Sequence, residues 1–193
     1  INGFGDPGAI EALRAELAAI SGAAALYDAA DMTQPDQIAA LVDRAVRETG
    51  RIDIAVNNAG IQHVAPIESF PDDRMEAIIR INLLSAWYVA KAAIPHMKAA
   101  GWGRIITTAS AHSLIASPNK SAYVMAKHGI AGLTKTAALD YAAKGIRINA
   151  VCPALISAGI GLRAISRATE LGVDLVSRHP VARAGRAEEV AQW

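Results

Sequence analysis

The sequence predicts an α/β protein: a single domain over residues 1–193 built on a doubly wound, Rossmann-like parallel sheet. Short apolar runs typical of strands alternate with longer segments of helical periodicity, which is the pattern of βαβ units. The length of 193 residues is enough for one domain with a substantial core. Hydrophobic residues make up 52% and charged residues 19%, which is typical of a folded chain rather than a disordered one.

In the first half, the elements expected in order are a helix over 7–20, a strand over 23–27, a helix over 35–49 and a strand over 52–57. The pair Asp6-Pro7 opens the first helix. Thr33 is expected to cap the second helix, and Gly50 stands in the usual stop position after it.

In the second half we expect a long helix from Pro71 toward Gly101, a strand over 105–109, a helix over 121–143 closed by Gly145, and a strand over 146–152. Pro95 should kink the long helix or end its regular part, because proline removes a backbone donor. Residues 154–180 are expected to form a substrate loop with helical pieces, and residues 186–193 to begin another helix.

A doubly wound nucleotide-binding sheet normally begins with a strand, a glycine-rich turn and a helix. No G-x-G-x-x-G spacing precedes Asn57, and we interpret Gly3, Gly5 and Gly8 as the turn after a second strand. We therefore expect the chain to begin inside the fold and to end before its last strand.

Composition excludes several classes of function. The formal net charge is +1 and no Lys/Arg cluster is present, so no nucleic-acid partner is expected. Cys152 is the only cysteine, which rules out an intrachain disulfide and fits a reducing, cytoplasmic compartment. We predict no metal site. We also expect no membrane partner, because no apolar run approaches the roughly 18 residues of a membrane span, and no signal peptide at Ile1.

The stretch from Ser110 to Lys127 carries the chemistry. Tyr123 and Lys127 are four residues apart, so on a helix they share a face. A nearby ammonium should lower the pKa of the phenol from its usual value of about 10, which would let it exchange a proton with a substrate oxygen. Ser110, thirteen residues upstream of Tyr123, would hydrogen-bond the same oxygen. Taken alone, Tyr-x-x-x-Lys is also typical of a surface helix pair.

Two asparagine segments have both a structural and a functional interpretation. Asn82 shares a helical stripe with apolar residues, which places its amide on a buried face where it needs partners. The run Asn57-Asn58-Ala59-Gly60 is either a plain turn or part of the ligand site at the carboxyl end of a strand.

These motifs together resemble the short-chain dehydrogenase/reductase family. The order and spacing match in the following segments: Asn57-Asn-Ala-Gly60, Asn82, Ser110, Tyr123-x-x-x-Lys127 and Asn149-Ala-Val-Cys-Pro153. Within that family, three local sequences are similar to the D-3-hydroxybutyrate dehydrogenase subfamily: Asn2-Gly-Phe-Gly-Asp6, Asn57-Asn-Ala-Gly-Ile-Gln-His63 and the run from Ser110 to Tyr123.

The resemblance implies a catalytic role for four residues. Tyr123 would be the general acid/base, and Lys127 would lower its pKa and bind the nicotinamide ribose. Ser110 would hold the substrate oxygen, and Asn82 would hold a water that links Lys127 to solvent.

The resemblance also implies that NAD is the cofactor. Asn58, Ala59 and Gly60 would line it, together with Tyr123, Lys127 and Pro153. Asp31 would accept a hydrogen bond from the adenine, although an aspartate near a helix start is more often a cap. We interpret Asn2–Asp6 as the turn after the second strand of the complete nucleotide-binding sheet, which is where a cation would bind the 2′-phosphate of NADP. The chain has no Lys or Arg before Arg14, which argues mildly against a 2′-phosphate.

A small anionic hydroxy or keto acid is the substrate that the resemblance implies. Gln62, His112 and Lys120 stand where the subfamily binds the substrate carboxylate, although charged loop residues are usually just solvated. Leu155 would wall the pocket in place of an expected Trp. A second expected Gln has no counterpart between Ala154 and Ser177.

Three interpretations follow. The first is an NAD-dependent 3-hydroxy acid dehydrogenase acting on D-3-hydroxybutyrate and acetoacetate. The second is a reductase of the same family for another carbonyl substrate, such as a 3-oxoacyl thioester or a sugar. The third is a non-catalytic fragment of such an enzyme. The resemblance further implies a homo-oligomer, a dimer or tetramer, and the alanine-rich segment around Ala137 and Ala138 would allow close helix contact.

Overall fold

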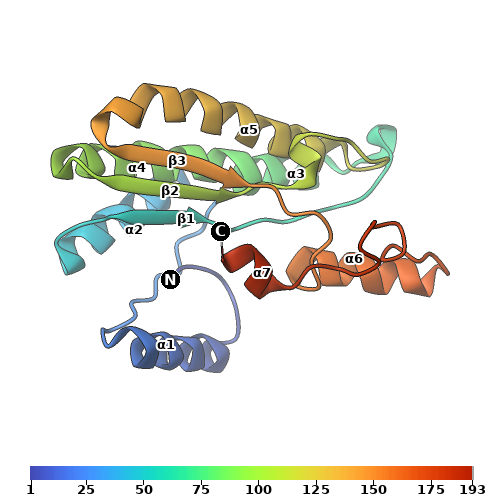
Figure 1. The fold of residues 1–193 in the computed structure, drawn as a ribbon, viewed down its shortest axis with the longest axis horizontal. Helices are drawn as coiled ribbons and strands as arrows, with labels where there is room; N and C mark the ends of the chain where they lie inside the picture. The colour runs from blue at the N-terminus through green and yellow to red at the C-terminus, as the bar shows by residue number, and fades with distance from the viewer. Residues whose placement is uncertain (193) are drawn as a thin grey trace.

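A parallel sheet of three strands forms the centre of the molecule. The computed structural model describes residues 1–192, and its sheet has the order β1 (Ile54–Asn57), β2 (Gly103–Thr108), β3 (Ile146–Val151) (Figure 1). Ile54 lies opposite Arg104 on β2, and Gly103 lies opposite Ile146 on β3. All three strands were predicted from apolar runs, and the structure confirms the parallel Rossmann-like arrangement.

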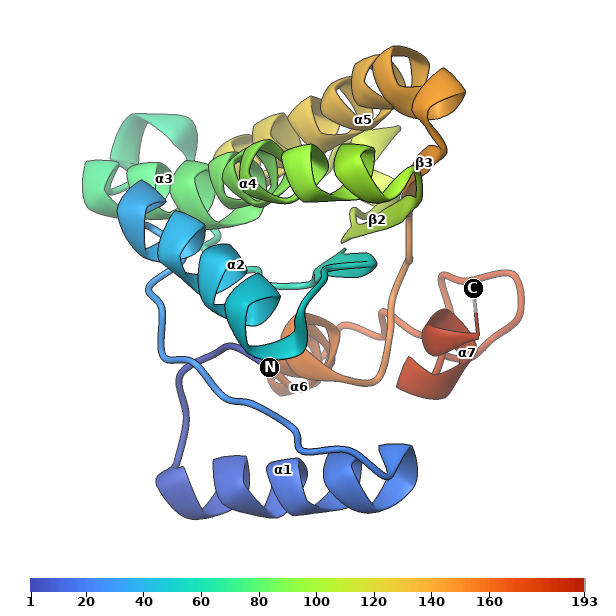
Figure 2. The same ribbon diagram turned by 90° about the vertical axis from the view of Figure 1, so that its left-hand side faces the viewer.

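Helices pack against one face of this sheet, and others lie on its far side without covering it, so Ile54 and Val56 of β1 are exposed there. The bounds of the helices are α1 (Pro7–Ser21), α2 (Pro35–Thr49), α3 (Asp72–Ile79), α4 (Ser85–Ala100), α5 (Ser121–Tyr141), α6 (Gly159–Glu170) and α7 (Ala187–Ala191). The helices α2, α4 and α5 lie on one face, whereas α1, α6 and α7 lie on the other (Figures 1 and 2). The carboxyl ends of the strands all point toward α3 and α6, so loops that leave these ends meet in one region (Figure 1).

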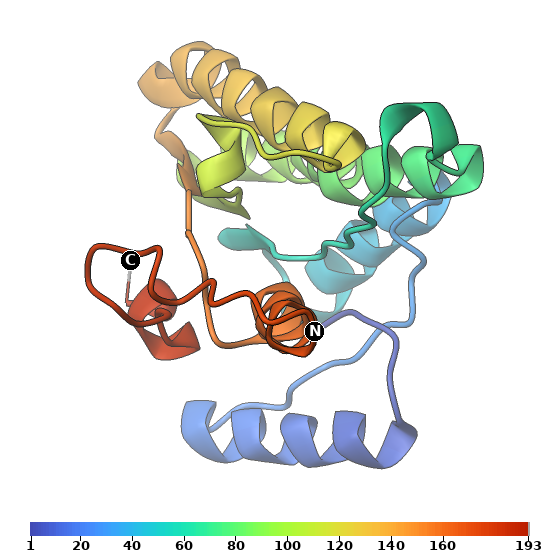
Figure 3. The same ribbon diagram turned by 90° about the vertical axis from the view of Figure 1, so that its right-hand side faces the viewer.

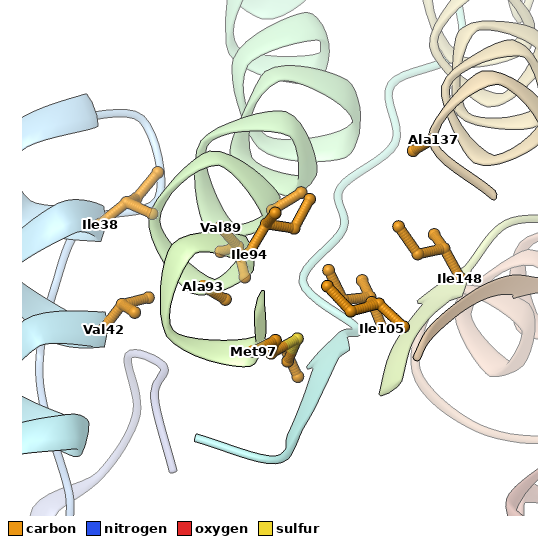
Figure 4. Packing of buried hydrophobic residues seen from close by; sticks show 12 residues of the cluster. Ile38, Val42, Val89, Ala93, Ile94, Met97, Ile105, Ala137 and Ile148 are labelled. Carbon is orange, nitrogen blue, oxygen red and sulfur yellow. The ribbon is translucent and has the colours of Figure 1, made fainter. Parts of the chain in front are cut away.

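The main core lies between the sheet and the helices α2, α4 and α5. Ile38 and Val42 from α2 point toward α4, and Met97 of α4 packs near Ile105 of β2 (Figure 4). Ile38 and Met97 are fully buried. Burial of an aliphatic side chain of this size contributes about 1.5–3 kcal/mol, so this cluster anchors the strands that carry the site.

Helix ends follow the predicted capping residues with one exception. The Asp6 carboxylate accepts a hydrogen bond from the backbone N–H of Ala9, so α1 begins at Pro7 and already contains Gly8. Gly8 therefore does not belong to the turn that we predicted. Thr33 does not cap α2: the cap residue is Gln34, with no side-chain cap, and the Thr33 hydroxyl instead accepts from the Gln34 amide.

The predicted strand over 23–27 is wrong. The only pairing found there among residues 1–192 is a single parallel bridge between Asn2 and Asp28. One bridge does not make a ladder, and neighbouring strands are what hold an extended segment in a sheet. Figure 3 shows α1 and its flanking segments set apart from the sheet.

The long helix is interrupted at a different place from the one predicted. Residues Arg80–Leu84 form a π-helical turn, in which the Ser85 N–H bonds to the Arg80 carbonyl five residues back. By contrast, α4 continues past Pro95 to Ala100, so the prediction that Pro95 ends the helix was wrong, and the alternative of a kink stays a prediction. The irregular turn is the one that holds Asn82. Such turns are often found at functional sites.

One helical segment, Asp72–Ala100, is long and apolar enough to cross a membrane: an 18-residue window within it has a mean hydropathy of 1.3. This corrects the expectation that no such run exists. The apolar face of its α4 part packs on α2, β1 and β2, which accounts for its composition within a folded core.

Candidate active site

Ser110 lies just beyond the end of β2. Its backbone is extended, and it caps a short 3₁₀ turn (Ala111–Ser113). The Ser110 Oγ accepts a hydrogen bond of 3.1 Å from the His112 N–H within this turn. The neighbouring Ala111 N–H donates to the Pro153 carbonyl at 2.8 Å. The ends of β2 and β3 are thereby joined, and the Ser110 hydroxyl is held at the carboxyl edge of the sheet.

Tyr123 and Lys127 lie in the first part of α5 and share its buried face. Tyr123 is 7% exposed and Lys127 is 4% exposed. The Lys127 ammonium donates a 2.6 Å hydrogen bond to the carbonyl of Thr108, the last residue of β2, and lies 5.7 Å from the centroid of the Tyr123 ring. The predicted pairing of these two residues on one helix face is confirmed.

The electrostatics of this pair differ from the prediction. Burial raises the pKa of Tyr123, and the hydrogen bond with the Ser110 hydroxyl only partly opposes it. Burial lowers the pKa of Lys127 to about 8. The expectation that Lys127 lowers the phenol's pKa was wrong, because removing both groups from water disfavours both charged forms. The group that lowers the phenol's pKa here is Ser110.

His112 and Lys120 lie close to this centre, as predicted. The His112 ring meets the Tyr123 ring edge-on at 5.8 Å between centroids. Its Nδ1 lies 3.3 Å from the Ser110 Oγ, and its Nε2 lies 2.8 Å from the Ser117 Oγ. The pKa of His112 is lowered, first by burial and then by the positive charge of Lys120, both of which disfavour the imidazolium form. Burial also lowers the pKa of Lys120, which directly precedes α5.

The side chain of Asn82 is 2% exposed, and both ends of its amide are occupied. The Oδ1 accepts from the Ile61 N–H at 2.8 Å, and the Nδ2 donates to the Ile61 carbonyl at 2.8 Å. The buried amide therefore has the partners that it was predicted to need. They are backbone groups of the segment after β1, and the water relay through Asn82 stays a prediction.

The segment after β1 is tied to the other loops of the site. Asn58 accepts from the Thr108 hydroxyl at 3.0 Å, which joins the ends of β1 and β2. Further along, the Ala65 N–H donates to the Asn119 carbonyl at 3.0 Å. Gln62 lies between these two ties. The glutamine and Lys120 therefore stand on segments that are directly bonded to each other.

The contacts of three further predicted residues are as follows, and of these only Pro153 reaches the loop that carries Ser110. The Asp31 carboxylate accepts from the Thr33 N–H at 2.8 Å, which is the turn-capping role that we weighed against adenine binding. The Leu155 carbonyl accepts from the Gly185 N–H at 2.9 Å. Pro153 contributes its carbonyl to Ala111, as described above. None of these contacts tests the roles that the resemblance implies.

Several residues of the site were missed by sequence reasoning. Ile61 binds Asn82 through its backbone, which no side-chain pattern reports. Thr108 also acts through its carbonyl. Its place at the end of β2, two residues before Ser110, was the available signal. Arg74 and Arg163, which line a hollow with Gln62, were not considered because nothing in their local sequence marks them.

The residues present fit the ribose half of a nicotinamide cofactor. Lys127 makes one hydrogen bond, to the Thr108 carbonyl, and an ammonium carries three donors. Two donors therefore remain for sugar hydroxyls. Asn58 and Ala59 are exposed at the carboxyl end of β1, where open α/β sheets receive their ligands.

Comparisons with known proteins agree with this arrangement. A family model described as enoyl-(acyl carrier protein) reductase matches residues 6–193. A D-beta-hydroxybutyrate dehydrogenase of Rhizobium meliloti is 49% identical over 156 residues, covering 81% of this chain and 60% of the relative. The chain thus spans about three fifths of that relative's length.

Two solved structures are similar in fold. NAD⁺-bound xylitol dehydrogenase has a TM-score of 0.85 and 30% identity, over 96% of this chain and 78% of that one. A gluconate 5-dehydrogenase from Burkholderia cenocepacia, in complex with NADP and tartrate, has a TM-score of 0.88 and 32% identity, over 100% of this chain and 74% of that one.

Proposed function

This chain belongs to the short-chain dehydrogenase/reductase family, and from that premise we propose that the protein is an NAD-dependent 3-hydroxy acid dehydrogenase. Its substrates would be D-3-hydroxybutyrate and acetoacetate. The observation that carries the proposal is the contact of His112 with both Ser110 and Tyr123. This contact puts a residue expected to bind a carboxylate beside the two residues expected to hold the reacting oxygen. The similarity to a D-beta-hydroxybutyrate dehydrogenase supports the same substrate.

The proposed chemistry assigns a distinct task to each buried group. A nicotinamide cofactor, held by Lys127 and the segment after β1, would supply the acceptor for the hydride that leaves the carbinol carbon. The Tyr123 phenolate would take the proton of the substrate hydroxyl and become the neutral phenol, while the Ser110 hydroxyl hydrogen-bonds that oxygen and fixes its position. The Lys127 ammonium, held by Thr108, would stabilise the phenolate before the proton arrives and bind the ribose with its two remaining donors.

Carboxylate recognition would fall to the polar groups on one side of Tyr123. His112 would donate a hydrogen bond from its ring, while the Lys120 ammonium supplies the charge. Gln62, on the segment bonded to Asn119, would complete the set. Charge-assisted hydrogen bonds suit a small acid that has little apolar surface to bury.

The test is NADH formation by the full-length protein with each enantiomer of 3-hydroxybutyrate. We expect activity on the D form and little on the L form. His112→Ala or Lys120→Ala should raise KM for the acid about tenfold or more and leave KM for NAD within about twofold, since charge-assisted contacts contribute about 1.5–3 kcal/mol. His96→Ala, a half-buried histidine of α4, and Lys135→Ala, an exposed lysine of α5, serve as controls of the same residue types. Equal activity on an uncharged alcohol would contradict the proposed substrate.

NAD rather than NADP is part of the same proposal. The segment before α1 carries no Lys or Arg that could bind a 2′-phosphate, and Asp6 there is engaged as a helix cap. The solved relatives include one complex of each cofactor. The ratio of kcat/KM for NAD to that for NADP decides the matter, and a ratio below one would contradict the proposal.

We also propose that the protein assembles as a homo-oligomer through α4 and α5. Trp87 on α4 is 44% exposed and Leu139 on α5 is 84% exposed, next to a hollow that the two helices line. Ala137, which we expected on this outer face, is instead buried in the main core. Light scattering on the full-length protein should give a dimer or tetramer, and Leu139→Lys should shift it toward the monomer.

A further inference from the structure

A small hollow includes Gln62, one of the residues proposed to bind the substrate carboxylate. It has a volume of about 210 Å³ and is lined by residues from three separate segments: Ile61, Gln62, His63, Arg74, Ile78 and Arg163. Its polar residues are an amide, an imidazole and two guanidinium groups. No acidic side chain lines it. A hollow with two cations and no anion has the donor chemistry of an anion-binding site.

The two arginines differ in what surrounds them. Arg74 on α3 has a loose contact of 3.7 Å with the exposed carboxylate of Asp73, so its charge is already partly offset. Arg163 on α6 has no ion pair and no side-chain hydrogen bond within residues 1–192. The only acidic residue of α6 is Glu170, two turns further along the helix. Arg163 is exposed, lines the hollow and has no protein partner within residues 1–192.

Helix α6 presents Arg163 toward the segment after β1. Ile160 of α6 approaches Gly60: a Cβ on that glycine would lie 3.9 Å from the Ile160 Cδ1. Residues three apart share a helix face, so Arg163 lies on the face that meets this segment. Figure 1 shows α6 on the far side of the sheet from α5, below the region where the strands end. The hollow is thus bounded by α6 on one side and α3 on another.

The altered side of the substrate pocket lacks the glutamine that the family resemblance leads one to expect, since residues 154–177 contain none. We propose that Arg163 takes that place: together with Gln62, it binds the carboxylate of the acid substrate in this hollow. The inference rests on the proposed function and names a specificity-determining residue for it. A guanidinium can hold a carboxylate through two parallel hydrogen bonds, which a glutamine amide cannot do.

The test measures binding separately from turnover. Calorimetry on the full-length protein saturated with NADH gives the Kd of butyrate, a non-reacting acid, and of butyramide, its neutral analogue. Arg163→Gln should weaken butyrate binding about tenfold and change butyramide binding less than about twofold, because only the charge-assisted contact is lost. Arg163→Lys keeps the positive charge but loses the two parallel guanidinium donors, so its Kd for butyrate should lie between those of the wild type and Arg163→Gln. Arg167→Gln makes the same charge change on α6 outside the hollow, and should bind both compounds as the wild type does.

The outcomes separate this inference from the proposed function. Three results would each overturn the role of Arg163. Arg163→Gln could bind butyrate as tightly as the wild type does, it could lose butyramide binding to the same extent as butyrate binding, or the wild type could fail to bind butyrate. If 3-hydroxybutyrate is turned over while Arg163→Gln binds butyrate normally, the subsite fails and the proposed function stands. If butyrate binding depends on Arg163 but 3-hydroxybutyrate is not oxidised, the subsite stands and the proposed substrate fails.

Discussion

Asn82 holds Ile61 by both of its backbone polar groups, through two hydrogen bonds of 2.8 Å from one amide side chain. The amide lies in the π-helical turn between α3 and α4, whereas Ile61 lies in the segment that leaves β1. This single side chain therefore joins the long helix to the segment that carries Gln62.

We predict that Asn82→Ala destabilises the protein by about 2–4 kcal/mol, because it leaves a buried N–H and a buried carbonyl of Ile61 without partners. Urea unfolding measures the loss. Asn57→Ala is the matched control: its amide makes one longer bond, 3.2 Å, to the Thr107 hydroxyl, so its loss should cost less than about 1 kcal/mol. Equal losses of unfolding free energy for the two variants would show that the pair of hydrogen bonds to Ile61 contributes no more than the single bond of Asn57.

Tyr123→Phe should lower kcat by about 10²–10⁴ while leaving the fold intact, because it removes the proton donor and keeps the buried ring. Steady-state kinetics and thermal unfolding measure the two effects. Tyr141→Phe, at the far end of α5, should be silent. A Tyr123→Phe variant that retains more than about a tenth of the wild-type rate would rule out the acid/base role.

Lys127 makes stability depend on pH in a defined window. Its pKa is about 8 in the folded protein and near 10.5 when unfolded, so between these values the unfolded chain binds more protons. The free energy of unfolding should therefore rise as pH increases from about 8 to 10, by an amount on the order of 3 kcal/mol, set by the pKa difference. Lys127→Met should lack this rise. Parallel pH profiles for wild type and variant would contradict a buried, charged Lys127.

Gly145 is the glycine that the fold can least replace. Its φ is +76°, and an added Cβ would lie 2.0 Å from the carbonyl oxygen of Gly101. Gly145→Ala should cost several kcal/mol, since it combines the left-handed strain of about 1–2 kcal/mol with a clash against backbone. Gly101→Ala has a similar φ of +65° but open space around it, and should cost only the strain. Chemical denaturation measures the unfolding free energies of the two variants. Similar losses would show that the backbone near Gly101 moves away from the added methyl group without further loss of stability.

Local spacing predicted much of this molecule. The strands, α2, α5 and the pairing of Tyr123 with Lys127 follow from periodicity and from fixed offsets along a helix, which depend little on distant residues. The failures have a common cause. The direction of the Tyr123 pKa shift, the interruption at Arg80–Leu84 rather than at Pro95, and the partner of Asn82 all depend on what the fold places around a residue. Residues 23–27 likewise lacked the neighbours that their strand propensity required.

The hydrogen bond between Ala65 and Asn119 has a consequence for the transfer of specificity between proteins. It joins two loops that are far apart in the sequence, one carrying Gln62 and the other carrying Lys120. If only one of these loops is grafted onto another scaffold, the Ala65 N–H and the Asn119 carbonyl no longer meet, and the grafted loop loses the hydrogen bond that positions it. The two loops depend on each other for their conformation, so they should be transferred to another protein together.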